Sequence, residues 1–430
     1  MCDGQATIAV ASRVGRLVWR RQVLMPPESG RHVVPGDSLL PAQGGMISTR
    51  GLQEGACLLA DTRPFATAAR LLGWQMQEEE GLCARTLRTL VREHGEMLAR
   101  AEEAEVRALA GRVAPGELEG LRPRLIPACT PRRRAAWPAA VSAAVDQARA
   151  AGQTQVPEGV RPCDGDRVLT ARRQEQAAAP DLRCLGPRVS AGEVVVSADE
   201  VLTRRPERRA FWELRTVRVV TTEGSRYVSG AGRSFLATLE VLCALAQAGP
   251  PGQAPRPLTF VVDGALWLRD FFAQALAPRG ATLLLDWSHV HHRCRQVSTQ
   301  VCRDKATRLR FVRTTTRLLW RGDVDGALAV AEEIRACAKA TGPLDQWIHY
   351  LDARRPLIPC YRDRHRQRQY IGSGHAEKAN DLLVARRQKN QGMHWSEETS
   401  VSLLRLRTLR LNGDWDAYWQ QGQCPSLCAA

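Results

Sequence analysis

The clearest pattern of apolar and polar positions begins near residue 191. An apolar run leads up to Asp199, and a similar run leads up to Asp263, so each predicts a buried strand that ends on an acid. Alternating segments between them predict further strands. The predicted strands are 193–199, 211–222, 225–229, 258–263 and 281–286. Helical periodicity over 234–248 and 265–277 places one helix before the fourth strand and one before the fifth.

This order of elements, β-β-β-α-β-α-β, predicts an α/β fold with a mixed sheet. Three antiparallel strands come first, and right-handed crossovers then add two parallel strands. The order matches the ribonuclease H-like fold. No internal repeat interrupts it.

Helical patterns dominate after the fifth strand. Four helices are predicted within an all-helical insertion, and a late helix over 375–389 follows the connector 355–371. Ser396 is a suitable N-cap for a last helix that reaches residue 411, with Glu397 and Glu398 in its first turn. The four insertion helices are 290–303, 305–320, 324–339 and 344–354.

The N-terminal third has weaker patterns. Helices are predicted over 64–72 and 85–92, followed by a longer one over 96–110. The first two favour equally a helix-turn-helix, which would offer Arg85, Arg88 and Arg92 to DNA, and a plain helical hairpin. The predicted regions are an extension of low order (1–57), a helical DNA-binding region (58–112), a basic linker rich in Pro, Arg and Ala (113–190), the first part of the core (191–289), the helical insertion (290–365), the final core helices (366–412) and a C-terminal tail (413–430).

Charge adds the first functional indication. The 430 residues carry a formal net charge of +16, which favours a polyanionic partner such as nucleic acid, although an arginine-rich composition alone explains it equally well. The arginines of the linker either touch a phosphate backbone or line a solvated loop. No apolar run approaches the roughly 20 residues of a membrane span. Thirteen scattered cysteines without a CxxC pair suit a reducing compartment, so we expect a cytoplasmic, nucleoid-associated protein without a membrane partner.

Two of the strand-terminal acids, Asp199 and Asp263, are expected to meet at one edge of the sheet. Paired carboxylates repel each other unless a cation lies between them, and Mg²⁺ prefers such oxygen ligands, with Mn²⁺ as a substitute. Glu377 on the late helix is the natural third ligand. Two ions roughly 3.5–4 Å apart would suit phosphodiester cleavage. Each acid alone could instead cap a turn or lie in the first turn of a helix.

Three segments resemble the motifs of bacterial insertion-sequence transposases with a DDE triad, especially the ISKra-like group. Residues 370–396 (YIGSGHAEKANDLLVARRQKNQGMHWS) resemble its signature, and residues 260–268 (FVVDGALWL) resemble its second catalytic motif. Residues 285–289 (LDWSH) are similar to a D-x-x-H motif shared with Mutator-type and hAT-type relatives. The resemblance covers about 190–420. It implies that Asp199, Asp263 and Glu377 are the catalytic triad and metal ligands, although Glu200 stands where many members have glycine.

Other residues are weaker candidates. His289, His291, His292 and Cys294 either form a metal cluster or, because they fan around more than one helix face, leave Asp286 and His289 a structural or DNA-positioning role. Residues 372–374, Gly-Ser-Gly, either cradle a phosphate or form an ordinary helix entry. Arg386, Arg387 and Lys389 either grip the DNA backbone or line a solvated face. Trp395 either stacks on a base or is buried against the last helix.

The combined prediction is an enzyme of DNA transposition and DNA recombination. It would bind the double-stranded ends of its mobile element and target DNA, cut with two Mg²⁺ ions and transfer the strand. A homo-oligomer is expected by analogy, because two ends must be held together. Two alternatives remain: an inactive or domesticated DNA-binding protein, and a structure-specific nuclease of the same fold.

Overall fold

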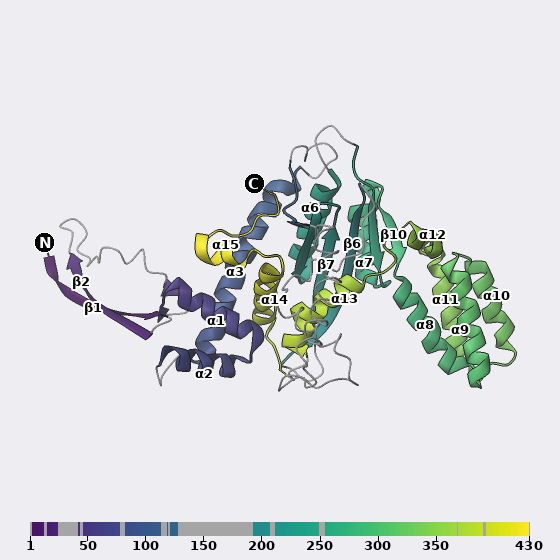
Figure 1. Ribbon diagram of the computed structural model, residues 1–430, viewed down its shortest axis with the longest axis horizontal. Coiled ribbons are helices and arrows are strands. Elements are labelled where there is room, and N and C mark those ends of the chain that lie inside the picture. The colour runs from purple at the N-terminus through teal and green to yellow at the C-terminus, as the bar shows by residue number, and fades with distance from the viewer. Residues whose placement is uncertain are drawn as a thin grey trace, which may run out of the picture.

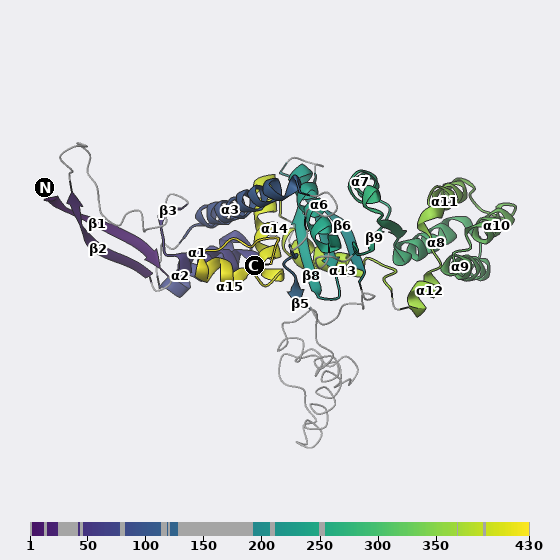
Figure 2. The ribbon, with the colours of Figure 1, turned by 90° about the horizontal axis from the view of Figure 1, so that it is seen from above.

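The computed structural model describes residues 2–12, 15–24, 42–43, 46–77, 82–112, 118, 121–127, 192–206, 211–248, 254–367, 369–389 and 393–429. The molecule is elongated, with a mixed sheet near its middle (Figure 1). A long β-hairpin extends from one end and a group of helices forms the other, as the second view also shows (Figure 2). None of the helices described is long and apolar enough to cross a membrane.

The central sheet has six strands in the order β10-β9-β6-β7-β8-β5. Strands β6, β7 and β8 pair antiparallel, whereas β9 pairs parallel with both β6 and β10. The prediction of a mixed sheet with an antiparallel trio and two parallel strands is therefore confirmed. The strands are β5 (Ile126–Pro127), β6 (Val194–Arg204), β7 (Phe211–Val220), β8 (Gly224–Gly230), β9 (Leu258–Val262) and β10 (Thr282–Leu285). The short edge strand β5 lies in the segment expected to be a linker, where Pro and Arg obscured any strand pattern.

The two faces of the sheet are covered by different helices. Val194, Val196 and Ala198 of β6 pack in one cluster with residues of α6 (Gly232–Ala248). Because side chains alternate along a strand, the odd-numbered β6 residues from Val195 to Thr203 face the other way. On that second face Val201 packs with residues of α13 (Gly374–Asn380) and of the π-helix η6 (Asp381–Lys389). The late helix predicted over 375–389 is thus present, with a widened second half.

The helical group follows β10. Asp286 caps its first helix, and the third ends at Arg335, earlier than the prediction of residue 339. A short helix lies in the predicted connector, where six residues are too few for a clear period. The elements are α7 (Leu266–Phe271), η3 (Phe272–Leu276) and η4 (Ala277–Arg279) before β10, and α8 (Trp287–Val301), α9 (Lys305–Trp320), α10 (Val324–Arg335), α11 (Gly342–Ala353), η5 (Arg355–Leu357) and α12 (Tyr361–Arg366) after it.

The N-terminal region differs from the prediction. Instead of an extension of low order, β1 (Cys2–Ser12) and β2 (Gly15–Leu24) form a hairpin, and α1 (Arg50–Thr62) begins before residue 58. The short strands β3 (Ala42–Gln43) and β4 (Met46–Ile47) lie between β2 and α1 in the chain. The Gly, Pro and Ser residues nearby masked the alternation of the strands. Helix α2 (Phe65–Met76) continues past Gly73, where the prediction ended it. Its C-cap is Gln77, which has a left-handed backbone conformation.

Helix α3 (Ala84–Ala110) is continuous, so the two helices predicted at 85–92 and 96–110 are one. Gly95 does not break it, because this glycine packs closely on Ser402 of α14 (Glu397–Leu411). The predicted linker 113–190 and the helix-turn-helix turn lie largely outside the described residues.

Helices from both ends of the chain share one core. Buried apolar side chains of α1, α2 and α3 pack against α14 and α15 (Trp415–Gln421). Trp415, Tyr418 and Trp419 belong to this core, which we call the N–C core. The segment predicted as a tail is therefore folded, and the predicted N-terminal DNA-binding region is not separate from the C-terminal helices. The sequence did not predict this packing, because the helices are far apart in the chain and α15 has only seven residues.

Candidate active site

Asp199 lies on the face of the sheet covered by α13. It shares the alternation of Val195 and Val201, and its Oδ1 accepts a hydrogen bond of 2.8 Å from the Glu200 backbone N–H. The strand does not end at Asp199, as the sequence suggested, but continues to Arg204 because β7 continues beside it. Pairing with β9 stops at Ser197, so Asp199 still stands just beyond the parallel part of the sheet.

Asp263 follows the last residue of β9 and turns the chain toward α7. Its Oδ1 accepts a hydrogen bond of 2.8 Å from the Ala265 backbone N–H. Gly264 has a φ of +98°, a conformation that residues with a Cβ seldom adopt. Asp263 does not cap α7, whose N-cap is Ala265 without a side-chain hydrogen bond; one of its oxygens instead stabilises the turn before that helix. In the described residues Asp199 and Asp263 each keep a second oxygen without a backbone hydrogen bond.

Glu377 projects from the first turn of α13 and its side chain is 45% exposed. Asn380, one turn further along, is buried, and its Nδ2 and Oδ1 have no hydrogen-bond partner. The Asn380 amide is nevertheless close enough to lower the pKa of Asp199. Asn380 was not predicted from the sequence. Its spacing of three residues from Glu377 on one helix could have indicated that it lies beside the candidate site.

The three acids interact through their charges. Burial raises the pKa of Asp199, and the charge of Asp263 raises it further. Burial also raises the pKa of Glu377, and the charges of Asp286, Asp199 and Asp263 add to that effect, whereas His289 opposes it. The structure thus brings the three candidate carboxylates to one edge of the sheet, where each disfavours the ionised form of another. We call this the acidic edge.

Asp286 is fully buried and holds two segments together. Its Oδ1 accepts hydrogen bonds from the backbone N–H and hydroxyl of Ser288, at 2.6 and 2.7 Å. Its Oδ2 accepts from the backbone N–H of Ser373, at 2.7 Å, and from the Ser373 hydroxyl. Although burial raises its pKa, His289, Ser373 and Ser288 lower the pKa of Asp286 to about 2. Residues 372–374 therefore wrap around this carboxylate and fix the start of α13.

His289 lies between Asp286 and Glu377. Its Nδ1 is 3.4 Å from Asp286 Oδ2 and 3.7 Å from Glu377 Oε1. Asp286 above all raises the pKa of His289, to about 9, against the opposing effect of burial. His289 is thus positively charged at neutral pH and balances Glu377.

Asp286, His289 and Glu377 also place one potential metal-ligating atom each within 4.8 Å of the others. A carboxylate offers about four lone-pair positions, and four hydrogen bonds from Ser288 and Ser373 occupy those of Asp286. Asp286 therefore has little capacity left for a cation, although the trio is compact.

The predicted set of Asp199, Asp263 and Glu377 does not place three ligand atoms within 4.8 Å of one another in the described residues, but its donor type is the one that hard divalent cations prefer. The donors are carboxylate oxygens, which Mg²⁺ and Mn²⁺ prefer. Their charges disfavour one another, and a cation would relieve that repulsion. The Asn380 amide, buried beside Asp199, adds a further polar group at this edge.

Two of the residues predicted to bind DNA are buried instead. Arg387 is 1% exposed: its Nε donates to the Ala60 carbonyl at 2.8 Å, and its guanidinium stacks on Phe65 and Trp395. Burial lowers the pKa of Arg387 to about 10. Trp395 is 2% exposed and donates to the Gln388 carbonyl, so the burial alternative is confirmed for it. Arg387 was misassigned because the π-helix η6 turns its side chain into the N–C core.

The other predicted DNA-binding residues lie at the surface. Arg386 and Lys389 are exposed on η6, and Arg386 forms an ion pair of 3.0 Å with Asp381. Arg85 and Arg88 are exposed on the first turns of α3. Arg92 has a partner in Glu398, with a distance of 3.0 Å between the side-chain nitrogen and oxygen.

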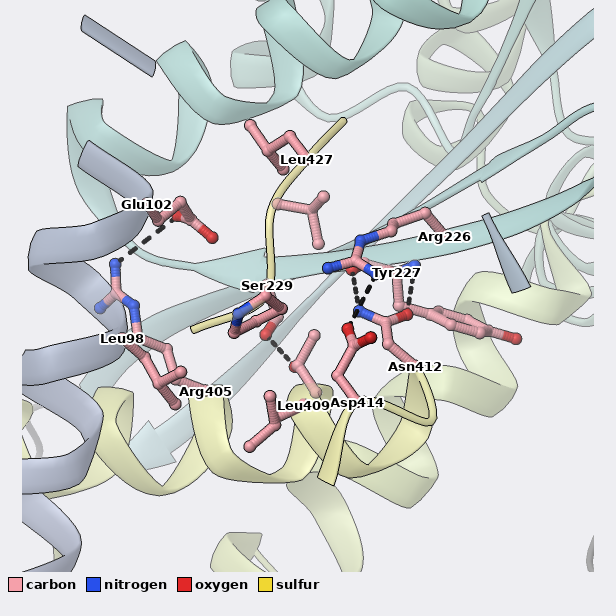
Figure 3. A pocket seen from close by; sticks show the side chains of 13 residues that line it. Leu98, Glu102, Arg226, Tyr227, Ser229, Arg405, Leu409, Asn412, Asp414 and Leu427 are labelled. Atoms are coloured by element: carbon pink, nitrogen blue, oxygen red, sulfur yellow. Dashed lines mark hydrogen bonds and ion pairs between the residues drawn. The ribbon is translucent and has the colours of Figure 1, made fainter. Parts of the chain in front are cut away.

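A cavity of about 50 Å³ lies away from the acidic edge, between α3, β8 and α14 (Figure 3). Arg226 pairs with Asp414 at 2.8 Å, and the hydroxyl of Thr238 donates to Glu102 at 2.9 Å. This volume holds only one or two water molecules. Polar side chains around the cavity connect α3 to the sheet. The cavity is too small for a nucleic-acid substrate.

Comparison of the chain with protein-family models gave no match, and a search among curated proteins gave none either.

Proposed function

We propose that this chain is a DDE transposase, an enzyme that cuts DNA at the ends of a mobile element and joins the freed strand to target DNA. The observation that carries the proposal is the acidic edge. Asp199 on β6, Asp263 after β9 and Glu377 on α13 come from three separate elements, yet their charges interact. Open α/β sheets bind ligands at this edge.

The strand order supports a ribonuclease H-like core. Three antiparallel strands precede two parallel ones. Strand β6 joins the two sets, because it pairs antiparallel with β7 and parallel with β9. Helices α8 to α12 would then be the insertion that separates the second aspartate from the glutamate. The resemblance of residues 260–268, 285–289 and 370–396 to transposase motifs points in the same direction.

In this proposal Asp199, Asp263 and Glu377 hold two divalent cations, Mg²⁺ or Mn²⁺. Such ions activate the attacking oxygen and stabilise the leaving oxygen of a phosphodiester. Asp286 and Ser373 keep the start of α13 in place, and His289 carries a positive charge beside Glu377. The net charge of +16 favours DNA as the substrate.

The test is a cleavage assay with the purified full-length protein. The substrate is a DNA fragment that carries the open reading frame with its flanking sequences, incubated with Mg²⁺, Mn²⁺ or EDTA. We expect Asp263→Asn to lose about a thousandfold or more in rate, since each 1.4 kcal/mol is a factor of ten and the metal contributes several. Asp270→Asn is the matched control, because Asp270 is an exposed acid on the following helix.

Cleavage by Asp263→Asn at the wild-type rate would overturn the proposal. Products in which the cut strand is joined to a second DNA molecule separate a transposase from a nuclease of the same fold. A wild-type protein that binds the fragment but never cuts it identifies a DNA-binding protein without activity.

A further inference from the structure

Three arginines from three elements lie near one another, and one of them, Arg354, is beside the loop of Asp263. Arg269 lies on α7, Arg293 lies on α8, and Arg354 directly follows α11. Arg354 reaches the loop after β9: a Cβ atom added to Gly264 would lie 3.1 Å from its Nε. The glycine after Asp263 therefore leaves the space that this guanidinium occupies.

The ring of Tyr350 on α11 positions two of these groups. The Cζ atom of Arg293 lies 4.1 Å from the ring centroid, and that of Arg354 lies 4.3 Å from it. A guanidinium over an aromatic face at this distance is attracted to the ring. Stacking fixes the plane of each group but leaves its N–H donors available, since the ring accepts no conventional hydrogen bond.

The charge of Asp263 acts on Arg354, but Asp263 forms no ion pair with any of the three arginines in the described residues. Among the described residues, no carboxylate forms an ion pair with Arg269, Arg293 or Arg354, and the Nε of Arg354 is buried without a hydrogen-bond partner. Burial lowers the pKa of Arg354, and the nearby Arg269 and Arg293 lower it further. By contrast, Arg355, the next residue in the chain, pairs with both Asp325 and Asp352.

We propose that Arg269, Arg293 and Arg354, with the ring of Tyr350, form a subsite that binds a backbone phosphate of DNA beside the acidic edge. The inference rests on the proposed function, because DNA is the ligand. Planar guanidinium groups with several free N–H donors suit a phosphate. Carboxylates at the edge repel the strand, and these arginines lie where they offset that repulsion next to Asp263.

A competing explanation is that the arginines only brace α11 and screen Asp263. That role affects stability but not the number of phosphates that the protein contacts. The salt dependence of DNA binding separates the two, because each phosphate contact adds about 0.9 to the slope of log K against log salt concentration.

The experiment measures binding of the full-length protein to a fluorescently labelled DNA duplex across a series of salt concentrations, in EDTA so that the probe stays intact. We expect Arg354→Gln and Arg293→Gln each to weaken binding by about tenfold and to reduce the slope by about one. Arg355→Gln removes the same charge from a residue that is already paired, and it should leave the slope unchanged. Thermal unfolding of each variant checks the fold, and the exposed Arg293 serves where Arg354→Gln proves unstable.

Slopes for Arg354→Gln and Arg293→Gln equal to the wild-type slope would overturn the subsite, whatever happens to stability. The same holds if Arg355→Gln reduces the slope equally, since the effect would then be one of net charge. The proposed function fails separately: a wild-type protein that binds DNA through Arg354 but does not cleave it retains the subsite and loses the transposase assignment.

Discussion

The acidic edge and the N–C core place charge in opposite ways. At the acidic edge Asp199, Asp263 and Glu377 keep carboxylate oxygens available and raise one another's electrostatic energy. In the N–C core, Asp61 pairs with Arg407 and Arg410, and Arg387 is buried between two aromatic rings with its Nε on a backbone carbonyl. Carboxylates that disfavour one another's ionised forms are typical of functional sites, whereas buried groups enclosed by the protein's own side chains are typical of a scaffold.

This difference corrects a prediction made from charge alone. Arg386, Arg387 and Lys389 are close in sequence, but Arg387 points into the scaffold while the other two are exposed. An arginine on a helix can reach either environment, because its long apolar stem packs wherever the helix faces inward.

Replacement of Arg387 should have the largest effect on stability. It tests whether the buried arginine of the N–C core supports the fold rather than DNA binding. Arg387→Ala leaves a cavity between Phe65 and Trp395 and should lower the free energy of unfolding by about 3 kcal/mol. Arg387→Met fills most of this space and should lower it less. Arg386→Ala, the matched control on the same helix, should change it by less than about 1 kcal/mol, since its ion pair is exposed.

Urea unfolding followed by tryptophan fluorescence gives these values. If Arg387→Ala were as stable as the wild type and instead weakened DNA binding, the division between scaffold and ligand site would be broken.

A smaller effect is expected at the boundary of the two regions. Ser373→Ala removes a buried donor from Asp286 and should lower the free energy of unfolding by about 1.5 kcal/mol. Since Ser373 precedes α13, the cleavage rate should fall as Glu377 loses its fixed position. Ser288→Ala removes a donor to the same carboxylate from an exposed position, where water replaces it, and should change stability by less than about 0.5 kcal/mol.

Denaturant unfolding and cleavage rates are measured on the same preparations. Equal losses of stability for Ser373→Ala and Ser288→Ala would contradict the role given to the buried side of Asp286.

The sequence predicted the sheet well and the helices around it less well. Apolar runs that end near Asp199 and Asp263 define strands, because a period of two and a buried sheet leave few alternatives. The edge strand β5 was missed because its two residues pair with the distant strand β8. The hairpin of β1 and β2 is local, and it was missed because nearby Gly, Pro and Ser residues masked its alternation.

In the candidate site, too, local sequence pattern predicted some residues and tertiary packing determined the others. Acids at strand ends were predictable, because strand direction determines which edge they share. The convergence of Arg293, Arg354 and Tyr350 was not, because it depends on how α8 and α11 pack. The burial of Asn380 beside Asp199 likewise depends on how α13 lies against the sheet.

Calorimetric titration with Mn²⁺ tests the central claim most directly, because it measures cation binding at the acidic edge without any requirement for DNA. Wild-type protein and Asp270→Asn should bind Mn²⁺ with the same affinity and stoichiometry, whereas Asp199→Asn, Asp263→Asn and Glu377→Gln should each bind it about tenfold more weakly or not at all. Unchanged Mn²⁺ binding by all three variants would contradict the assignment of these acids as a metal site.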